Sequence, residues 1–137
     1  MAKTFSNMLP LGTKAPSFKL LDTVLGTKRS LNELKGLNGT IVMFICNHCP
    51  YVIHINQELV LLAKELLTKG IKFIAISSND TKNYPQDGPI AMGTHAKKMK
   101  YFFPYLYDKT QQIAEAYDAA CTPDFYLFNS ELKLTYR

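Results

Sequence analysis

The sequence is poor in the features that mark disordered, fibrous, secreted and membrane-spanning chains. Of its 137 residues only seven are Gly and seven are Pro, while 47% are apolar, a composition that excludes collagen-like structure and extensive disorder. The first ten residues hold no apolar stretch of roughly 7 to 15 residues, as a secretion signal requires. No run approaches the roughly 18 apolar residues of a membrane span. We therefore expect a cytoplasmic protein that has no membrane partner.

Cysteine is also scarce, because the sequence contains only Cys46, Cys49 and Cys121. A chain of this length lies well below the roughly 250 residues at which cores split, so residues 1–137 are expected to form a single domain. Such a domain buries roughly 68% of its unfolded surface and needs no disulfide for stability. The three thiols are therefore available for chemistry.

Arginine is rare although the chain is basic. Sixteen Lys and Arg residues against eleven Asp and Glu residues give a formal charge of +5, yet only Arg29 and Arg137 are arginines. The lysines are scattered, and no recognised nucleic-acid-binding motif accompanies the charge. We therefore expect no nucleic-acid partner.

Strand-like and helix-like segments alternate along the chain, which is the pattern of an α/β domain. Strands are predicted at residues 18–20, 40–46, 71–77 and 105–107, with a closing hairpin formed by 125–128 and 132–136. Helices are predicted from the capping box at 30–33 to Gly36, from Pro50 to Gly70, over about ten residues after Pro89, and at 111–117. Residues 79–89 are predicted to form a polar loop.

The segment Cys46-Asn47-His48-Cys49-Pro50 lies where a buried strand is predicted to meet a long helix. A Cys-x-x-Cys sequence near a βαβ pattern is typical of a redox pair. The N–H groups at a helix start stabilise a thiolate and lower its pKa from about 8.5, and a thiolate attacks disulfides. We expect Cys46 to be the nucleophile and Cys49 the resolving thiol.

His48 precedes Cys49 directly, and an imidazolium there favours a neighbouring thiolate and hence the reduced pair. The alternative is that His48 is only a solvated polar residue. His54 and His95 lie on predicted helices without an evident partner, so we interpret them as structural or exposed.

Two other interpretations of the cysteine pair remain open. A zinc site could be assembled from Cys46, Cys49, Cys121 and one histidine, although zinc sites usually show a second ligand pair at regular spacing. The pair could also be a structural part of the core. The ligand count favours redox chemistry, so we expect neither a metal nor a cofactor.

Several motifs follow one another in an order known from one protein family; they are residues 12–18, 30–36, 46–50, 103–108 and Thr122-Pro123. With them the chain resembles the thioredoxin-fold superfamily, and within it the peroxiredoxin-like thiol oxidoreductases of the alkyl hydroperoxide reductase and thiol-specific antioxidant group. The resemblance implies a mixed central sheet flanked by helices, with an N-terminal hairpin extension. It also implies that Pro123 is a cis-proline facing the cysteine pair, that Thr122 offers backbone hydrogen bonds to a partner, and that Cys121 is a third redox thiol.

The sequence departs from this family in ways that favour disulfide exchange. Cys49-Pro50 resembles the peroxidatic Cys-Pro of peroxiredoxins, but Cys46 stands where they have Thr or Ser, and the arginine expected before the late strand is absent. Rapid peroxide reduction would lack that charge stabilisation. We predict exchange with a disulfide-bearing protein or small thiol, and peroxide reduction by Cys49 is the alternative. Thioredoxins carry a buried acid where this chain has Thr40, so proton removal must use water, His48 or a group distant in sequence.

The end of the chain also departs from the superfamily pattern, in which a helix follows the closing hairpin. Here the sequence stops at Arg137, within the last predicted strand. One apolar sheet face is then expected to be uncovered, and large apolar patches rarely remain exposed to water. We expect either a truncated C-terminus or a homodimer.

Overall fold

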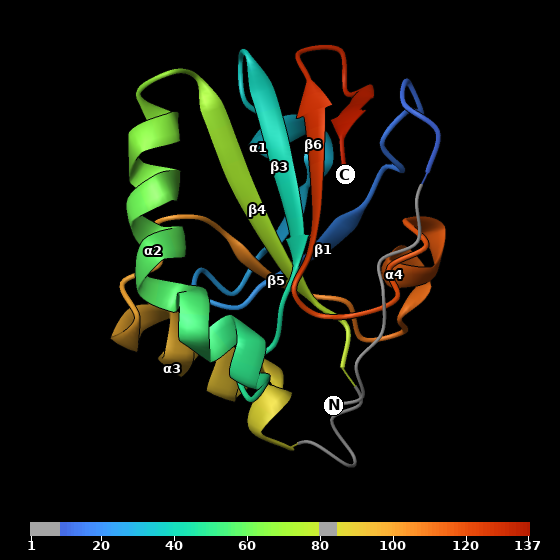
Figure 1. Ribbon diagram of the computed structural model, residues 1–137. Coiled ribbons are helices and arrows are strands. Elements are labelled where there is room, and N and C mark those ends of the chain that lie inside the picture. Colours follow the sequence, from blue (N-terminus) through green and yellow to red (C-terminus); the bar gives the residue numbers. More distant parts are fainter. Residues whose placement is uncertain (1–8, 80–84) are drawn as a thin grey trace.

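The computed structural model describes residues 9–79 and 85–137. Within these ranges the strands form one mixed sheet in the order β2-β1-β5-β4-β3-β6-β7 (Figure 1). The strands are β1 (Lys19–Asp22), β2 (Lys28–Ser30), β3 (Gly39–Phe44), β4 (Ile71–Ser77), β5 (Tyr105–Tyr107), β6 (Asp124–Asn129) and β7 (Leu134–Tyr136). The helices are α1 (Leu31–Leu34), α2 (Pro50–Leu67), α3 (Pro89–Lys98) and α4 (Gln112–Ala116), with a 3-10 turn η1 (Pro85–Asp87). This confirms the predicted α/β, thioredoxin-like architecture with β1 and β2 as an N-terminal hairpin.

The order of the strands brings two loops to one edge of the sheet. Strands β3 and β4 are parallel and are joined by the crossover helix α2, while β6 pairs antiparallel with β3 on its other side. Parallel neighbours end at the same edge of a sheet. The segments that follow β3 and β4 therefore lie beside the segment that precedes β6.

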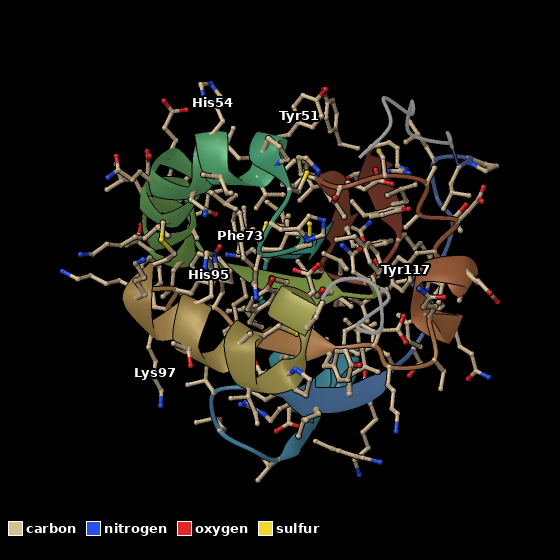
Figure 2. All side chains as sticks on the ribbon, turned by 90° about the horizontal axis from the view of Figure 1, so that it is seen from below. Tyr51, His54, Phe73, His95, Lys97 and Tyr117 are labelled. Carbon is tan, nitrogen blue, oxygen red and sulfur yellow. The ribbon has the colours of Figure 1, made fainter. Side chains whose placement is uncertain are left out.

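Helices cover both faces of the sheet, with α2 and α3 on one side and α1 and α4 on the other (Figure 1). Val42 and Phe44 of β3 pack into the core beneath α1 and α4, whereas Met43 belongs to the core beneath α2 and α3. Figure 2 shows Phe73 in the α2–α3 core and Tyr117 in the opposite one. Burial on both faces explains why the sequence of β3 is nearly all apolar.

Local sequence signals place most of the helix ends. The capping box that starts α1 is formed, with Glu33 N donating to Ser30 Oγ at 3.3 Å and Ser30 N donating to Glu33 Oε1 at 3.0 Å. Helix α2 starts at the predicted Pro50 and ends at Leu67, three residues before the left-handed Gly70. Helix α3 has the predicted ten residues.

Two predicted segments near the cysteine pair differ from the structure. The strand expected at residues 40–46 spans Gly39–Phe44, because the ladder with β6 ends where Phe44 pairs with Asp124. Cys46 thus lies two residues beyond the strand rather than at its end. In the predicted loop 79–89, residues 80–84 lie outside the described part of the chain, and Pro85–Asp87 forms η1.

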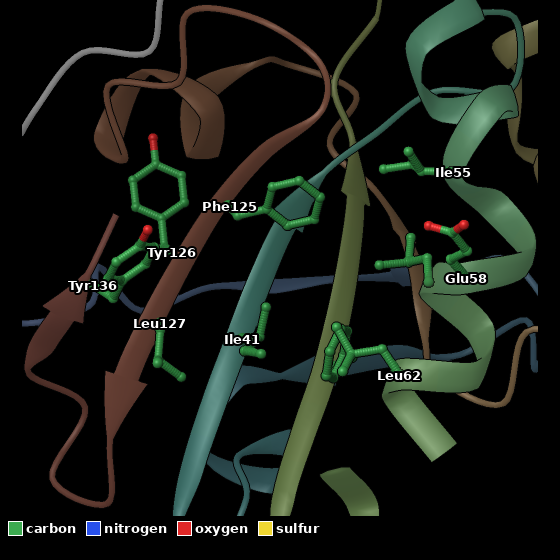
Figure 3. A pocket seen from close by; sticks show the side chains of 10 residues that line it. Ile41, Ile55, Glu58, Leu62, Phe125, Tyr126, Leu127 and Tyr136 are labelled. Carbon is green, nitrogen blue, oxygen red and sulfur yellow. The ribbon is translucent and has the colours of Figure 1, made fainter. Parts of the chain in front are cut away.

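An apolar recess lies on the α2 side of the sheet, over β3 and β6 (Figure 3). Its cavity of about 350 Å³ is bordered by Ile41 and Phe125 from the sheet and by Ile55 and Leu62 from α2. Tyr136 borders the recess and is 70% exposed. Among the described helices, none combines the length and the apolar character that crossing a bilayer requires.

Candidate active site around Cys46 and Cys49

The register between β3 and β6 brings the cysteine segment to Thr122. Phe44, the last residue of β3, pairs with Asp124, the first residue of β6, in an antiparallel ladder. Cys46 follows Phe44 by two residues and Thr122 precedes Asp124 by two residues, so Cys46 lies opposite Thr122. The Cys46 Sγ lies 3.6 Å from the Thr122 hydroxyl, and the Cys49 Sγ donates to the Thr122 carbonyl at 3.3 Å. Both sulfurs therefore contact the residue whose bond to Pro123 is cis, as the family resemblance implies.

Cys49 is the N-cap residue of α2, and Pro50 is the first residue of that helix. Proline suits this position because its missing N–H has no helical partner there in any case. Cys46 and Cys49 are both fully buried, and no disulfide joins the three cysteines. Both thiols therefore lie together near the start of α2.

Burial dominates the electrostatics of Cys46 and raises its pKa from 9.0 to about 11. That value already includes the Asp87 carboxylate and Cys49, which also raise the pKa, and the Thr122 hydroxyl and the Cys49 backbone N–H, which lower it. This differs from the lowered pKa that the motif predicts. The physical reason is that Cys46 precedes α2 by four residues, so it lies outside the first turn of the helix and inside an apolar core.

A buried carboxylate, Asp87, lies beside the pair and was not singled out by the sequence. It is 0% exposed. Asn47 N donates to its Oδ1 at 2.9 Å, and Asn79 Nδ2 donates to its Oδ2 at 3.0 Å. His48 Nδ1 forms an ion pair with the same Oδ2. His48 therefore contacts a buried carboxylate. The alternative that His48 is only a solvated polar residue is wrong.

The sequence gives only an indirect signal for Asp87. Because it stands just before Gly88-Pro89 at the start of a predicted helix, it resembles an ordinary capping residue. The N-cap of α3 is instead Gly88, without a side-chain capping bond, and the Asp87 carboxylate turns toward Asn47 and His48. The sequence does lack a carboxylate between Lys35 and Val52. Any acid or base that acts on the cysteine pair therefore has to come from elsewhere in the chain.

A polar network supports the site from the α3 and β5 side. Tyr105 donates its hydroxyl to Asn47 Oδ1 at 2.8 Å, and Tyr101 donates to Asn56 Oδ1 at 2.7 Å. Burial raises the pKa of both tyrosines, which keeps them neutral hydrogen-bond donors. His95 lies 3.4 Å from the Tyr101 hydroxyl, whereas His54 is exposed on the outer side of α2 (Figure 2).

Both arginines of the chain are engaged with carboxylates. Arg29 bonds Asp22 at 3.4 Å and Glu33 at 3.0 Å. The side chain of Arg137 is 1% exposed and contacts the buried Asp124 through two nitrogens, at 2.5 and 3.2 Å. The structure therefore places both guanidinium groups in ion pairs, which agrees with the missing peroxide-binding arginine noted in the sequence.

Cys121 directly precedes Thr122 in the chain but lies in a different setting from the cysteine pair. It is partly buried, and its Sγ donates to the Pro123 carbonyl at 3.9 Å. Together with Thr122, Glu115 and Asp118 it borders a groove of about 450 Å³. This groove leads along α4 to the residue that contacts both redox sulfurs. The family resemblance implies that Cys121 is a third redox thiol, whereas a cycle of Cys46 and Cys49 alone does not require it.

One group of side chains within the described residues has the composition of a metal site. The ligand atoms of Cys46, His48 and Asp87 all lie within 4.8 Å of one another. This set differs from the zinc site considered from the sequence, because Asp87 takes part and Cys121 does not. The difference arises because Asp87 comes from the loop after β4, which sequence spacing does not connect to the cysteine pair.

The sheet order, the cis-proline and the two thiols on Thr122 define a thioredoxin-fold protein with a Cys-x-x-Cys site. The sequence matches the AhpC/TSA family over residues 11–137, and the chain belongs to that family. It is similar to the thiol-disulfide oxidoreductase ResA of Bacillus subtilis (strain 168), with 30% identity over 130 residues that cover 90% of this chain and 64% of ResA. The chain thus spans less than two thirds of that relative.

Solved structures agree with this assignment. An uncharacterized conserved protein from Geobacillus kaustophilus is 52% identical with a TM-score of 0.94, and the match covers 96% of this chain and 70% of that one. The thioredoxin domain of a thiol-disulfide oxidoreductase from Bacteroides vulgatus has a TM-score of 0.74 at 20% identity, over 93% of this chain and 87% of that domain. The second similarity shows the fold alone.

Proposed function

We propose that this protein is a thiol-disulfide oxidoreductase that cycles Cys46 and Cys49 between a dithiol and a disulfide. The observation that carries the proposal is the contact of both sulfurs with Thr122, which holds the two thiols at one point beside the cis-proline. In the cycle, one thiolate attacks a partner disulfide and releases one partner thiolate. The second cysteine then attacks the mixed disulfide, closes the Cys46–Cys49 bond and releases the other partner thiol.

The substrate class follows from the surroundings of Thr122. The groove beside Thr122 and Cys121 has room for an extended segment, and backbone hydrogen bonds to a strand end are a general way to bind such a segment. We therefore propose a disulfide-bearing protein segment or a small disulfide as partner. Glu115 and Asp118 at the groove favour a partner with positive charge near its disulfide.

The roles of the two thiols remain the predicted ones, with Cys46 attacking and Cys49 resolving. The raised pKa of Cys46, about 11, leaves about one molecule in 10⁴ with a Cys46 thiolate at pH 7. Exchange through Cys46 is therefore expected to accelerate roughly tenfold for each pH unit between 7 and 10. A pH-independent rate in this range would assign the attack to another sulfur.

The proposal is tested with a disulfide-reduction assay that uses insulin and a dithiol reductant. Cys46→Ser and Cys49→Ser should each abolish turnover, and Cys49→Ser should accumulate a mixed disulfide on Cys46. Cys121→Ser reports whether the third thiol takes part, and a cycle of two cysteines predicts that it retains turnover. Wild-type protein without measurable turnover, together with a pair that never forms a disulfide, contradicts the proposal.

A second candidate function is peroxide reduction by Cys49. The sequence Cys49-Pro50 at the start of α2, which resembles the peroxidatic Cys-Pro of peroxiredoxins, favours it. The engagement of both arginines in ion pairs weighs against fast peroxide chemistry. A sulfenic acid trapped on Cys49 in the Cys46→Ser variant after peroxide treatment would establish this activity.

A further inference from the structure

We propose that the reduced protein binds one Zn²⁺ ion through Cys46, His48 and Asp87, and that closing the Cys46–Cys49 disulfide expels this ion. The binding half of the proposal stands on the geometry alone. The expulsion half rests on the proposed redox function, because it requires that the pair cycles.

The three side chains supply donor atoms that zinc prefers, namely a thiolate sulfur, an imidazole nitrogen and a carboxylate oxygen. Their ligand atoms lie within 4.8 Å of one another. In a tetrahedral zinc site, with bonds of about 2.0 to 2.3 Å, neighbouring ligand atoms are about 3.3 to 3.6 Å apart. Shifts of little more than about 1 Å therefore bring the more distant ligand atoms to this spacing, while His48 Nδ1 and Asp87 Oδ2, which are in direct contact, move apart to admit the ion. The fourth position is left to solvent.

The charge of the cluster also fits a divalent cation. Cys46 and Asp87 are both fully buried, and a thiolate beside a buried carboxylate repels it in a poorly screened environment. A Zn²⁺ ion between one thiolate, one carboxylate and a neutral imidazole makes the site neutral as a whole. This is the charge state that burial favours.

The carboxylate is already fixed for such a role. Asn47 N and Asn79 Nδ2 hold the two oxygens of Asp87, and the Tyr105 hydroxyl holds the side chain of Asn47. Partners of this kind orient metal ligands in known sites. His48 Nδ1 lies in direct contact with Asp87 Oδ2, and zinc would take the place of this contact. The 21% exposure of the His48 side chain provides a path for the ion from solvent.

Redox control follows because Cys46 serves both as ligand and as half of the dithiol. Zinc binding converts the Cys46 thiol to a zinc-bound thiolate and releases one proton. When a substrate disulfide oxidises the pair, the Cys46 thiolate and the Cys49 thiol become one disulfide, and the substrate yields one thiolate and one thiol. The electron pairs thus pass to the substrate sulfurs, and Zn²⁺ loses its sulfur ligand and leaves.

The test uses metal-free full-length protein, reduced with a phosphine that does not bind zinc, and a chromophoric chelator that competes for Zn²⁺. We expect one equivalent of tightly bound Zn²⁺, and a sulfur-to-metal absorption band of one thiolate when Co²⁺ replaces it. Asp87→Asn and His48→Ala should each weaken binding by about tenfold or more. His54→Ala, which removes an exposed histidine of α2, is the matched control and should bind as wild type.

Three results overturn the proposal. They are the absence of stoichiometric binding, equal affinity in Asp87→Asn and His48→Ala, and a Co²⁺ band of two thiolates that persists in both variants. If Asp87→Asn fails to fold by circular dichroism, His48→Ala decides, since its side chain is partly exposed. Glutathione disulfide should release the ion as the Cys46–Cys49 bond forms. Insulin turnover measured in excess chelator tests the redox function without zinc. The zinc-binding proposal and the redox function can therefore fail independently of each other.

Discussion

Replacing Asp87 by Asn should make Cys46 ionise more readily in metal-free protein. The carboxylate raises the pKa of Cys46, and its oxygen lies within 4.8 Å of the sulfur. At that separation two unit charges interact by about 0.9 kcal/mol at a dielectric constant of about 80, and by about 3.5 kcal/mol at about 20. Removing the charge should therefore increase the thiolate fraction at pH 7 between about fourfold and about 300-fold. Asn keeps an oxygen for the Asn47 N–H, so the loop retains that anchor.

The assay is the rate of iodoacetamide alkylation of Cys46 as a function of pH, with chelator present and with Cys49→Ser and Cys121→Ser as the common background. Glu131→Gln is the control, because it removes the same charge from the exposed β6–β7 turn and should leave the profile unchanged. An Asp87→Asn profile that stays at the wild-type pH, or that moves to higher pH, refutes the electrostatic role assigned to Asp87.

Four further outcomes are expected. Thr122→Ala removes the hydroxyl that lowers the pKa of Cys46, so alkylation at pH 7 should slow about fivefold for about 1 kcal/mol lost, and an unchanged rate contradicts this. The free energy of unfolding, measured by urea titration, should fall as the pH rises from about 9 to about 11. The reason is that Cys46 and the buried tyrosines have raised pKa values in the folded protein and ionise first in the unfolded chain. A free energy that does not change over this pH range argues against their burial. Arg137→Ala removes the guanidinium that pairs with the buried Asp124 carboxylate and should lower the free energy of unfolding by about 3 to 5 kcal/mol, whereas a loss under about 1 kcal/mol would show that Asp124 is solvated. Sedimentation should reveal concentration-dependent self-association through the apolar recess, and a monomer that binds no apolar dye removes the reason to expect it.

Much of the fold could be predicted because local signals determine it. The apolar run of β3 indicates a strand buried on both faces, and the Ser30–Glu33 capping box starts α1 as predicted. The end of β3 could not be placed, since it depends on where β6 begins to pair. That register, with Phe44 opposite Asp124, is a property of two strands about 80 residues apart in the sequence.

The candidate site was predictable in its thiols and not in its electrostatics. The Cys-x-x-Cys spacing and the Thr122-Pro123 motif identify the residues that the sheet brings together. The high pKa of Cys46 results from burial, which the motif does not encode. Asp87 could not be predicted as part of the site, because its contact with Asn47 spans 40 residues of the sequence. This contact exists only where the loops after two parallel strands meet.

The most direct test of the account is a redox titration of the protein in glutathione buffers, with the disulfide mapped by mass spectrometry at each potential. We predict one two-electron transition in which a Cys46–Cys49 bond forms and Cys121 stays reduced. Thiols that remain unpaired at every potential, or a bond that joins Cys121 to either partner, would contradict it.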